Sequence, residues 1–81
     1  MRLFDITITT SEKTLYHGRV SSVVVPSTLG YMGVLADHAP LIATLAEGRI
    51  ALKEDSDEQK IFESKAGGVI EVMKNNVTIL L

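Results

Sequence analysis

The most constraining feature of this sequence is a long segment that carries almost no charge. Between Val20 and Ala46 the only formally charged residue is Asp37, whereas residues 53–65 hold eight charged residues in thirteen positions. A small domain normally mixes both charge signs over its surface. The uncharged segment must therefore be buried in the core of the domain, covered by a partner, or both, and we expect both.

Short runs of alternating hydrophobic and polar residues predict an all-β fold. Phe4, Ile6 and Ile8 alternate with polar residues, which is the period of a half-buried strand. Strands are expected at residues 3–9, 14–20, 23–25, 31–35, 41–45, 49–53, 60–66, 69–73 and 77–81. Because no convincing helical period is present, these closely spaced strands predict a β-sandwich or flattened barrel. The 81 residues suffice for one domain, residues 1–81.

Proline, glycine and asparagine punctuate these strands. Pro26 lacks a backbone N–H, so its strand is expected to end there or to lie at a sheet edge. Gly18 is a candidate for a β-bulge. The segment Lys74-Asn75-Asn76 is expected to form a tight turn in which an asparagine adopts the left-handed conformation. The charged residues 54–59 are expected to form a solvated hairpin tip.

Composition disfavours several classes of function. The sequence has no cysteine, which leaves no disulfide, thiolate nucleophile or cysteine-type zinc site. The formal net charge is −2 and no basic cluster is present, so nucleic-acid binding is not expected. No apolar run reaches the length of a membrane span, and the N-terminus lacks a signal-peptide layout. We expect a soluble domain that does not insert into the membrane directly.

Three features resemble reactive sites, and each has a simpler interpretation. His38 has only the adjacent Asp37 as an orienting carboxylate, and neighbours on an extended chain point to opposite faces. The run Gly30 to Gly33 lacks the Gly-Lys-Ser/Thr ending and the following helix of a phosphate loop. The acidic run Glu54 to Glu58 lacks the spacing and the glycine of a calcium loop. No catalytic residue, metal ion or cofactor is therefore expected.

An alternative function is suggested by the segment Glu71-Val72-Met73-Lys74. This segment is similar to the lysine-bearing hairpin of biotinyl and lipoyl carrier domains, which are also small β-sandwiches. Such a carrier needs a lysine at an exposed hairpin tip, and Lys74 meets that need. Asn75, however, stands where carriers usually have methionine or another apolar residue. The alternative is a carrier domain modified at Lys74, which a mass adduct after expression with a biotin ligase would favour.

A set of short motifs runs in order along nearly the whole chain. The central ones are Gly30-x-x-Gly33-Val34-Leu35 and His38-Ala39-Pro40-Leu41. The supporting ones are Leu15-Tyr16-x-Gly18-x-Val20, Val25-Pro26, Gly48-x-Ile50, Gly67-Gly68-x-x-Glu71-Val72 and Asn76-Val77-Thr78-Ile79-Leu80. Each motif alone is weak, but the ordered set is specific. Together they resemble the ε subunit of bacterial and plastid F-type ATP synthases.

The resemblance implies a fold, a role and partners. The N-terminal domain of that family is a β-sandwich of two five-stranded sheets at the foot of the central stalk. It docks on the γ subunit and on the loops of the membrane-embedded c-ring. The implied role is a non-catalytic rotor subunit that couples proton flow to ATP synthesis and is monomeric when isolated. The implied location is peripheral, on the cytoplasmic side of the bacterial plasma membrane or the stromal side of a thylakoid membrane.

The resemblance also implies two contact surfaces. The expected c-ring interface comprises Ser27, Thr28, Leu29, Gly30, Tyr31 and Met32, and the expected γ interface comprises Thr10, His38, Leu41 and Ile42. Within the first, Leu29, Tyr31 and Met32 are expected to be apolar anchors, the alternative being that Tyr31 and Met32 fold back into the core. A joint that transmits torque requires few unpaired charges at the centre of its contacts, which would account for the uncharged segment.

The sequence departs from the family pattern at a few positions. Ala36 stands where proline is frequent, and Ser27 and Thr28 stand where glycine or an acidic residue is frequent. Typical members continue into a pair of C-terminal helices that inhibits ATP hydrolysis, whereas this sequence stops at Leu81. The helical domain is therefore expected to be absent, either in a naturally short member or in an isolated N-terminal domain.

Overall fold

The computed structural model describes residues 2–81, and this part of the chain forms nine β-strands and no helix. The strands are β1 (Phe4–Thr9), β2 (Thr14–Val20), β3 (Ser22–Ser27), β4 (Gly30–Val34), β5 (His38–Thr44), β6 (Gly48–Lys53), β7 (Gln59–Ser64), β8 (Val69–Lys74) and β9 (Asn76–Leu80). Residues 2–81 accordingly contain no helix that is long and apolar enough to cross a membrane.

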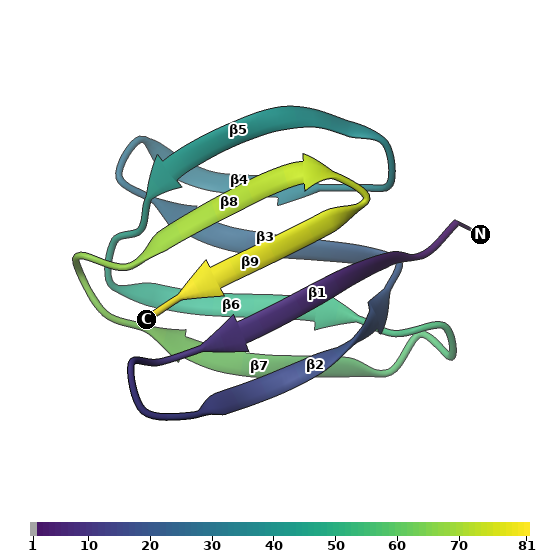
Figure 1. The fold of residues 1–81 in the computed structure, drawn as a ribbon, viewed down its shortest axis with the longest axis horizontal. Helices are drawn as coiled ribbons and strands as arrows, with labels where there is room; N and C mark the ends of the chain where they lie inside the picture. Colours follow the sequence, from purple (N-terminus) through teal and green to yellow (C-terminus); the bar gives the residue numbers. More distant parts are fainter. Residues whose placement is uncertain (1) are drawn as a thin grey trace.

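The strands form two sheets packed face to face, as Figure 1 shows. One sheet has the order β2-β1-β9-β8-β5 and the other has the order β4-β3-β6-β7. Strands β1 and β9 are parallel, and the other paired strands in residues 2–81 are antiparallel. The predicted β-sandwich is confirmed. The second sheet has four strands rather than five, because the chain beyond β5 meets β3 only at the isolated Ser27–Leu45 bridge.

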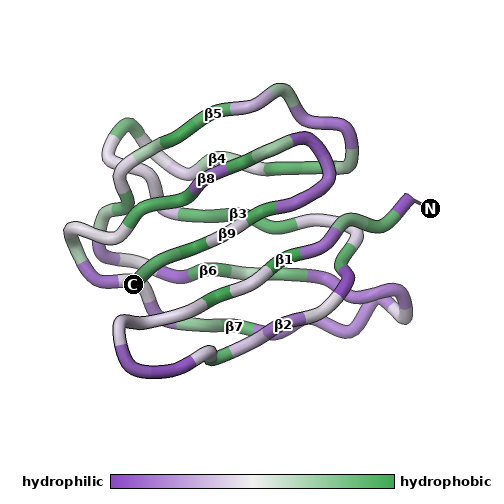
Figure 2. Tube along the Cα trace, viewed as in Figure 1, coloured by the Kyte–Doolittle hydropathy of each residue, from purple (hydrophilic) through white to green (hydrophobic). Residues whose placement is uncertain are grey.

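The core lies between the two sheets and consists of side chains that alternate along the strands. The fully buried hydrophobic residues are Phe4, Ile6, Ile8, Val20, Val23, Val25, Val34, Leu45, Ile50, Leu52, Ile70, Val72, Val77 and Ile79. Figure 2 shows that hydrophilic residues gather in several of the turns, most clearly those between β1 and β2, β6 and β7, and β8 and β9. The burial of Phe4, Ile6 and Ile8 confirms the inward face that the alternation of residues 3–9 predicted.

Strand β3 continues through Pro26 and ends one residue later at Ser27. The ladder between β3 and β6 covers only Ser22 to Val24, so Pro26 lies at a local edge and its missing N–H leaves no gap in that ladder. The carbonyl of Pro26 is still satisfied, because it accepts a hydrogen bond of 2.7 Å from the N–H of Ala46. Strand β5 likewise contains Pro40, and a register shift between His38 and Leu41 accommodates it.

Gly18 does not lie at a β-bulge, so that prediction is wrong. It pairs in register with Ile6, and the register shift of this ladder lies between Ile8 and Thr9. The glycine is needed for space instead, because a methyl group at Gly18 would lie 2.7 Å from the hydroxyl oxygen of Tyr16. The sequence predicted an irregular backbone at Gly18, whereas the structure has a regular backbone there with the Tyr16 side chain packed close to it.

Tyr16 links the two sheets where β2 and β7 form neighbouring edges. Its hydroxyl donates a hydrogen bond to the carboxylate of Glu54, which follows β6. Its ring packs at a tilt against that of Phe62 in β7, with the ring centroids 5.7 Å apart. Burial raises the pKa of Tyr16 to about 12, and the hydrogen bond and negative charge of Glu54 act in the same direction. The fold therefore favours the neutral phenol.

The turn between β8 and β9 forms where it was predicted, but a different residue adopts the left-handed conformation. Lys74 has a φ of 54°. The side chain of Asn75 instead bonds to the β4–β5 connection: its Oδ1 accepts the N–H of Asp37 at 2.7 Å, and its Nδ2 donates to the carboxylate of Asp37 at 3.0 Å. Asn75 thereby ties the β8–β9 turn to the neighbouring connection.

Candidate interaction surface

The predicted c-ring segment forms the tight hairpin between β3 and β4. Ser27 pairs with Gly30, leaving Thr28 and Leu29 as the two turn residues. The Oγ of Ser27 donates to the carbonyl of Gly30 at 2.6 Å and accepts the N–H of Leu29 at 3.2 Å. The Leu29 side chain is 98% exposed. A large apolar side chain is thus presented to solvent at the tip of a turn held by internal hydrogen bonds.

Tyr31 and Met32 lie on opposite faces of β4, so only one of them is covered by the sandwich. Met32 is partly buried and packs against the core, whereas Tyr31 is 63% exposed. The hydroxyl of Tyr31 accepts the N–H of Arg49 at 3.3 Å and lies close to Gly48. The Tyr31 ring therefore crosses the outer face of the four-stranded sheet, and Met32 presents less of its side chain to a partner.

The four residues of the predicted γ interface all lie in or beside the five-stranded sheet but not at one point. His38, Leu41 and Ile42 are in β5, an edge strand, while Thr10 follows β1 at the opposite end of the sheet (Figure 1). The Ile42 side chain is 72% exposed, whereas Leu41 is partly buried against the core. Of these residues, Ile42 offers the largest apolar contact on the outer face.

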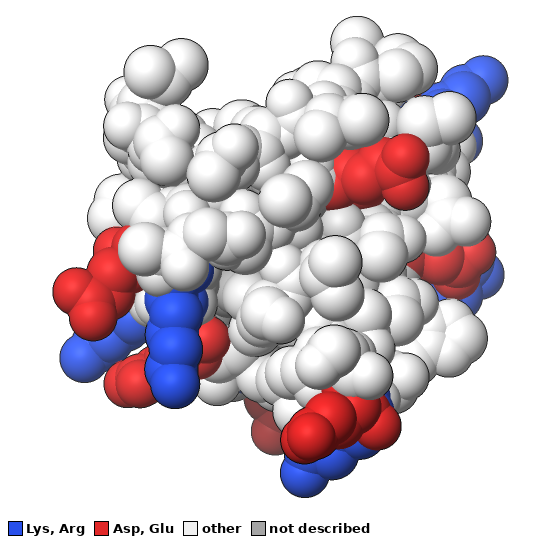
Figure 3. All heavy atoms as spheres, turned by 60° about the vertical axis from the view of Figure 1, so that its left-hand side comes forward, with Lys and Arg blue, Asp and Glu red and all other residues white. Residues whose placement is uncertain are grey.

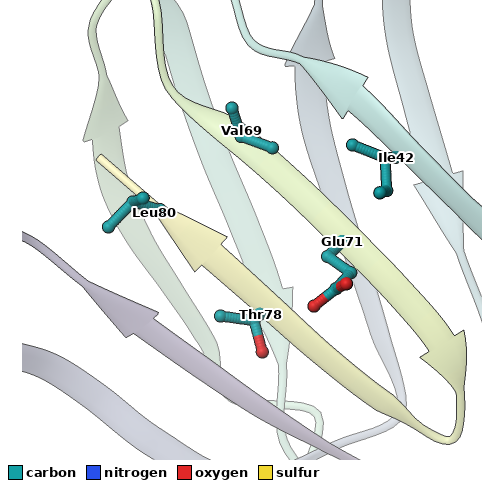
Figure 4. A pocket seen from close by; sticks show the side chains of 5 residues that line it. All are labelled: Ile42, Val69, Glu71, Thr78 and Leu80. Carbon is teal, nitrogen blue, oxygen red and sulfur yellow. The ribbon is translucent and has the colours of Figure 1, made fainter.

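A shallow hollow beside Ile42 extends the apolar surface across three strands of the five-stranded sheet. Figure 4 shows its lining residues, which are Ile42 from β5, Val69 and Glu71 from β8, and Thr78 and Leu80 from β9. The hollow has a volume of about 290 Å³. Within it, the register sets Ile42 beside Glu71 and Val69 beside Leu80. Sequence reasoning missed this site, although the alternation along β8 and β9 was a signal for these outward positions.

Asp37, the charged residue of the segment 20–46, is paired with a cation of its own chain. Its carboxylate forms an ion pair with the guanidinium of Arg2. The two side chains are 40% and 69% exposed, so the pair contributes little to stability. Its effect is to neutralise the connection between β4 and β5. The β3–β4 hairpin, β4 and β5 therefore present a surface with no unpaired charge.

Charged side chains gather elsewhere. Figure 3 shows an extended uncharged area over the upper part of one side of the molecule, interrupted by one acidic group, with acidic and basic groups along its lower and right-hand margins. Such areas on small domains commonly mark protein contacts. The uncharged segment 20–46 thus contributes both to the core and to the exposed surface, while its coverage by a partner stays a prediction.

The groups considered for catalysis do not form a reactive cluster within residues 2–81. The Nδ1 of His38 lies 2.7 Å from the carbonyl oxygen of Ala39, while Asp37 bonds to Arg2 and Asn75. The described residues contain no group of three or more His, Cys, Asp or Glu that is arranged to hold a metal ion. The arrangement is suited to protein contact.

A family model matches nearly the whole chain. Residues 3–81 match the model of the β-sandwich domain of the ATP synthase delta/epsilon chain. The chain belongs to this family. The match extends over nearly the whole sequence, in agreement with the ordered motifs.

Relatives of this chain within the ATP synthase delta/epsilon family are named ATP synthase epsilon chain. The ATP synthase epsilon chain of Leptospira borgpetersenii serovar Hardjo-bovis is 42% identical over 76 residues, which cover 94% of this chain and 58% of that protein. The ATP synthase epsilon chain of Halorhodospira halophila is 34% identical over 80 residues, which cover 99% of this chain and 57% of that protein. The chain thus spans less than two thirds of the length of these relatives.

Solved structures share the delta/epsilon sandwich fold. A chain of the mitochondrial ATP synthase of Euglena gracilis, in an OSCP/F1/c-ring structure, superposes with a TM-score of 0.89 at 22% identity, covering 96% of this chain and 49% of that one. A chain of the central stalk and c-ring structure from Tetrahymena thermophila has a TM-score of 0.74 at 17% identity, covering 94% and 60%. At these identities the likeness establishes the fold alone.

The comparisons do not favour the carrier-domain alternative, because the family match and the relatives' names both point to the ATP synthase. Lys74 is exposed at the β8–β9 turn, as a carrier lysine would be. The adjacent Asn75, however, directs its side chain to Asp37. Exposed lysines are common in surface hairpins, so the exposure of Lys74 does not by itself indicate a carrier domain.

Proposed function

We propose that this chain acts as a rotor subunit of a proton-translocating F-type ATP synthase, in which its β-sandwich joins the γ subunit to the c-ring. The observation that carries the proposal is the uncharged surface of the β3–β4 hairpin, β4 and β5, on a sandwich whose core side chains are fully buried. A joint under torque needs rigid elements, because a compliant contact would absorb rotation. It also needs contacts that remain favourable when buried, which unpaired charges are not.

The β3–β4 hairpin is the segment we assign to the c-ring, with Ser27 to Met32 as its contact residues. Leu29 is its principal anchor, because its side chain is almost completely exposed on a turn that two Ser27 hydrogen bonds hold in place. Tyr31 supplies a second anchor beside it. The contribution of Met32 is smaller, since its side chain faces the core.

The outer face of β5 is the surface we assign to γ, with Thr10, His38, Leu41 and Ile42 as contact residues. Ile42 is its principal anchor, because it is 72% exposed and borders the hollow between β5, β8 and β9. An apolar side chain of γ seated in this hollow would cover Ile42, Val69 and Leu80 together. Leu41 supports the strand from the core side.

In this role the chain has no active site of its own and requires no cofactor. It is held at the membrane through the c-ring, on the cytoplasmic side of a bacterial plasma membrane or the stromal side of a thylakoid membrane. Catalysis belongs to other subunits, and the chain contributes mechanical continuity between them.

Capture experiments with single charged substitutions test the two contact surfaces. We expect Leu29→Glu to abolish capture of the c-ring and Ile42→Glu to abolish capture of γ, because each buries a carboxylate without a partner. Both variants should keep the melting temperature of the parent within about 2–4 °C, because exposed substitutions change stability by about 0.5 kcal/mol or less. Thermal unfolding and co-purification measure these two effects separately.

Ile61→Glu is the matched control. Ile61 is 49% exposed in β7, at the opposite edge of the four-stranded sheet from β4 and outside the sheet that contains β5. It should therefore fold and capture both partners normally. Normal retention of γ by Ile42→Glu, or of the c-ring by Leu29→Glu, would overturn the corresponding assignment. Failure of the parent chain to bind either partner would overturn the proposed function.

A further inference from the structure

The four edge strands of the sandwich differ in how well they are protected against pairing with another chain. Free sheet edges are normally blocked by charge, proline or irregular register. Strand β5 contains Pro40 and a register shift. Strand β2 carries Arg19 and pairs through a register shift, and β7 carries Lys60 and Glu63. None of these three edges presents a regular, uncharged backbone.

The β4 edge has no such protection. Its five residues, Gly30 to Val34, include no charged residue and no proline. Its register with β3 is unbroken from Gly30 to Val34. Strand β4 pairs with β3 on one side only, and it is the end strand of its sheet. The β4 edge therefore has the regular backbone that strand addition needs. The other three edges contain charged side chains, a proline or a register shift.

The direction of the free backbone groups follows from Pro26. It lies opposite Tyr31 but has no N–H, and its carbonyl bonds to Ala46, so Pro26 and Tyr31 are not a hydrogen-bonded pair. Antiparallel ladders alternate between hydrogen-bonded and non-hydrogen-bonded pairs. Tyr31 and Gly33 therefore both direct their N–H and C=O groups away from β3.

These outward groups have no hydrogen-bond partner among residues 2–81. The hydrogen bonds of the turns and side chains in this part of the chain include none to the backbone N–H or C=O of Tyr31 or Gly33. The space beside Gly33 is also open, since a methyl group built there would meet no atom within 4 Å. A second backbone can approach this position closely.

We propose that the edge of β4 accepts an extended main-chain segment of a partner, and that the partner is a c-ring loop. The inference rests on the proposed function and adds the mode of contact. Gly30 and Tyr31 belong both to the assigned c-ring surface and to β4, so a loop that covers Leu29 reaches this edge next. Strand addition needs no charged side chains, because the backbone amide and carbonyl groups of the β4 edge form the hydrogen bonds.

Backbone amide exchange in the rotor complex tests this mode directly. In the free chain the amides of Tyr31 and Gly33 should exchange quickly, while those of Met32 and Val34, which bond to β3, should be protected. On binding of the purified c-ring, the amides of Tyr31 and Gly33 should become protected. Hydrogen–deuterium exchange resolved by residue, with and without the c-ring, provides this comparison.

A matched pair of substitutions tests the outward N–H group of Gly33. Gly33→Pro removes the outward N–H without removing a bond to β3, whereas Gly33→Ala keeps that N–H and has space for its methyl group. We expect Gly33→Pro to weaken c-ring binding about five- to tenfold, as loss of one hydrogen bond implies. Gly33→Ala should bind within about twofold of the parent. Thermal unfolding identifies any loss of the fold.

The outcomes separate this inference from the proposed function. If the parent chain binds the c-ring but the Gly33 amide still exchanges quickly, strand addition is wrong while the rotor role stands. Equal c-ring binding by folded Gly33→Pro and Gly33→Ala variants would also overturn strand addition. Protection produced by γ and not by the c-ring would overturn the choice of partner. A parent chain that binds neither would overturn the proposed function itself.

Discussion

Replacing Gly18 with alanine should destabilise the sandwich through Tyr16 rather than through the backbone. The added methyl group would lie 2.7 Å from the hydroxyl oxygen and 3.0 Å from Cζ of Tyr16. Ordinary contacts between such atoms are about 3.5 Å or longer, so the ring must move. Its movement is resisted on two sides, by the hydrogen bond to Glu54 and by packing against Phe62.

The cost follows from these contacts. Overpacking of this kind costs about 1–3 kcal/mol, and the displaced hydroxyl also loses part of a charge-assisted hydrogen bond. We expect a total loss of about 2 kcal/mol in the free energy of unfolding. For a domain of this size, that corresponds to a fall in melting temperature of about 8–16 °C. Urea unfolding and thermal unfolding both measure it.

The same substitution in a Tyr16→Ala background is the decisive control. Removing the Tyr16 ring removes the three atoms nearest to the added methyl group, and alanine in a strand interior is more stable than glycine by about 0.5–1 kcal/mol. The effect of Gly18→Ala should therefore change sign in that background. An equal loss of stability in both backgrounds would refute the steric argument and restore a backbone requirement for glycine at position 18.

Three further predictions concern single side chains. Ser64 is buried and donates to a main-chain carbonyl at 2.8 Å, so Ser64→Ala should lower the unfolding free energy by about 1–2 kcal/mol in urea titrations. The folded state raises the pKa of Tyr16 from 10.0 to about 12, so the stability it contributes is fully present below pH 10 and is lost as pH rises to 12; Tyr16→Phe should remove this dependence, measured by unfolding at each pH. Lys74 has a φ of 54°, so Lys74→Asn should raise the unfolding free energy by about 0.5 kcal/mol, and unchanged or reduced stability would contradict this.

Much of the architecture could be predicted from alternation alone. The inward residues Phe4, Ile6 and Ile8 were identified by period, because a strand buried on one face needs apolar side chains at every second position. Strand boundaries were less certain where proline intervened. β5 begins at His38 rather than Leu41, because a register shift around Pro40 lets the strand start earlier. Local propensity cannot anticipate that shift, since the partner strand creates it.

The resemblance implied two contact surfaces, but not which of their residues face outward. The sequence identified Leu29 and Tyr31 as apolar residues without nearby charge, but their exposure depends on which face of β4 meets the core. Alternation places Tyr31 and Met32 on opposite faces of the strand, and only the packed sandwich shows that Met32 faces the core and Tyr31 faces outward. The hollow beside Ile42 was not predicted at all, because its lining comes from β5, β8 and β9.

The all-β class, the inward face of β1 and the uncharged character of the segment 20–46 follow from composition and from a period of two residues. The packing of the two sheets established the other features. It paired Asp37 with Arg2 across 35 positions, gave Gly18 its role beside Tyr16 and left the β4 edge open. Each of these results depends on residues distant in sequence becoming neighbours, and strand order and register alone establish which residues meet.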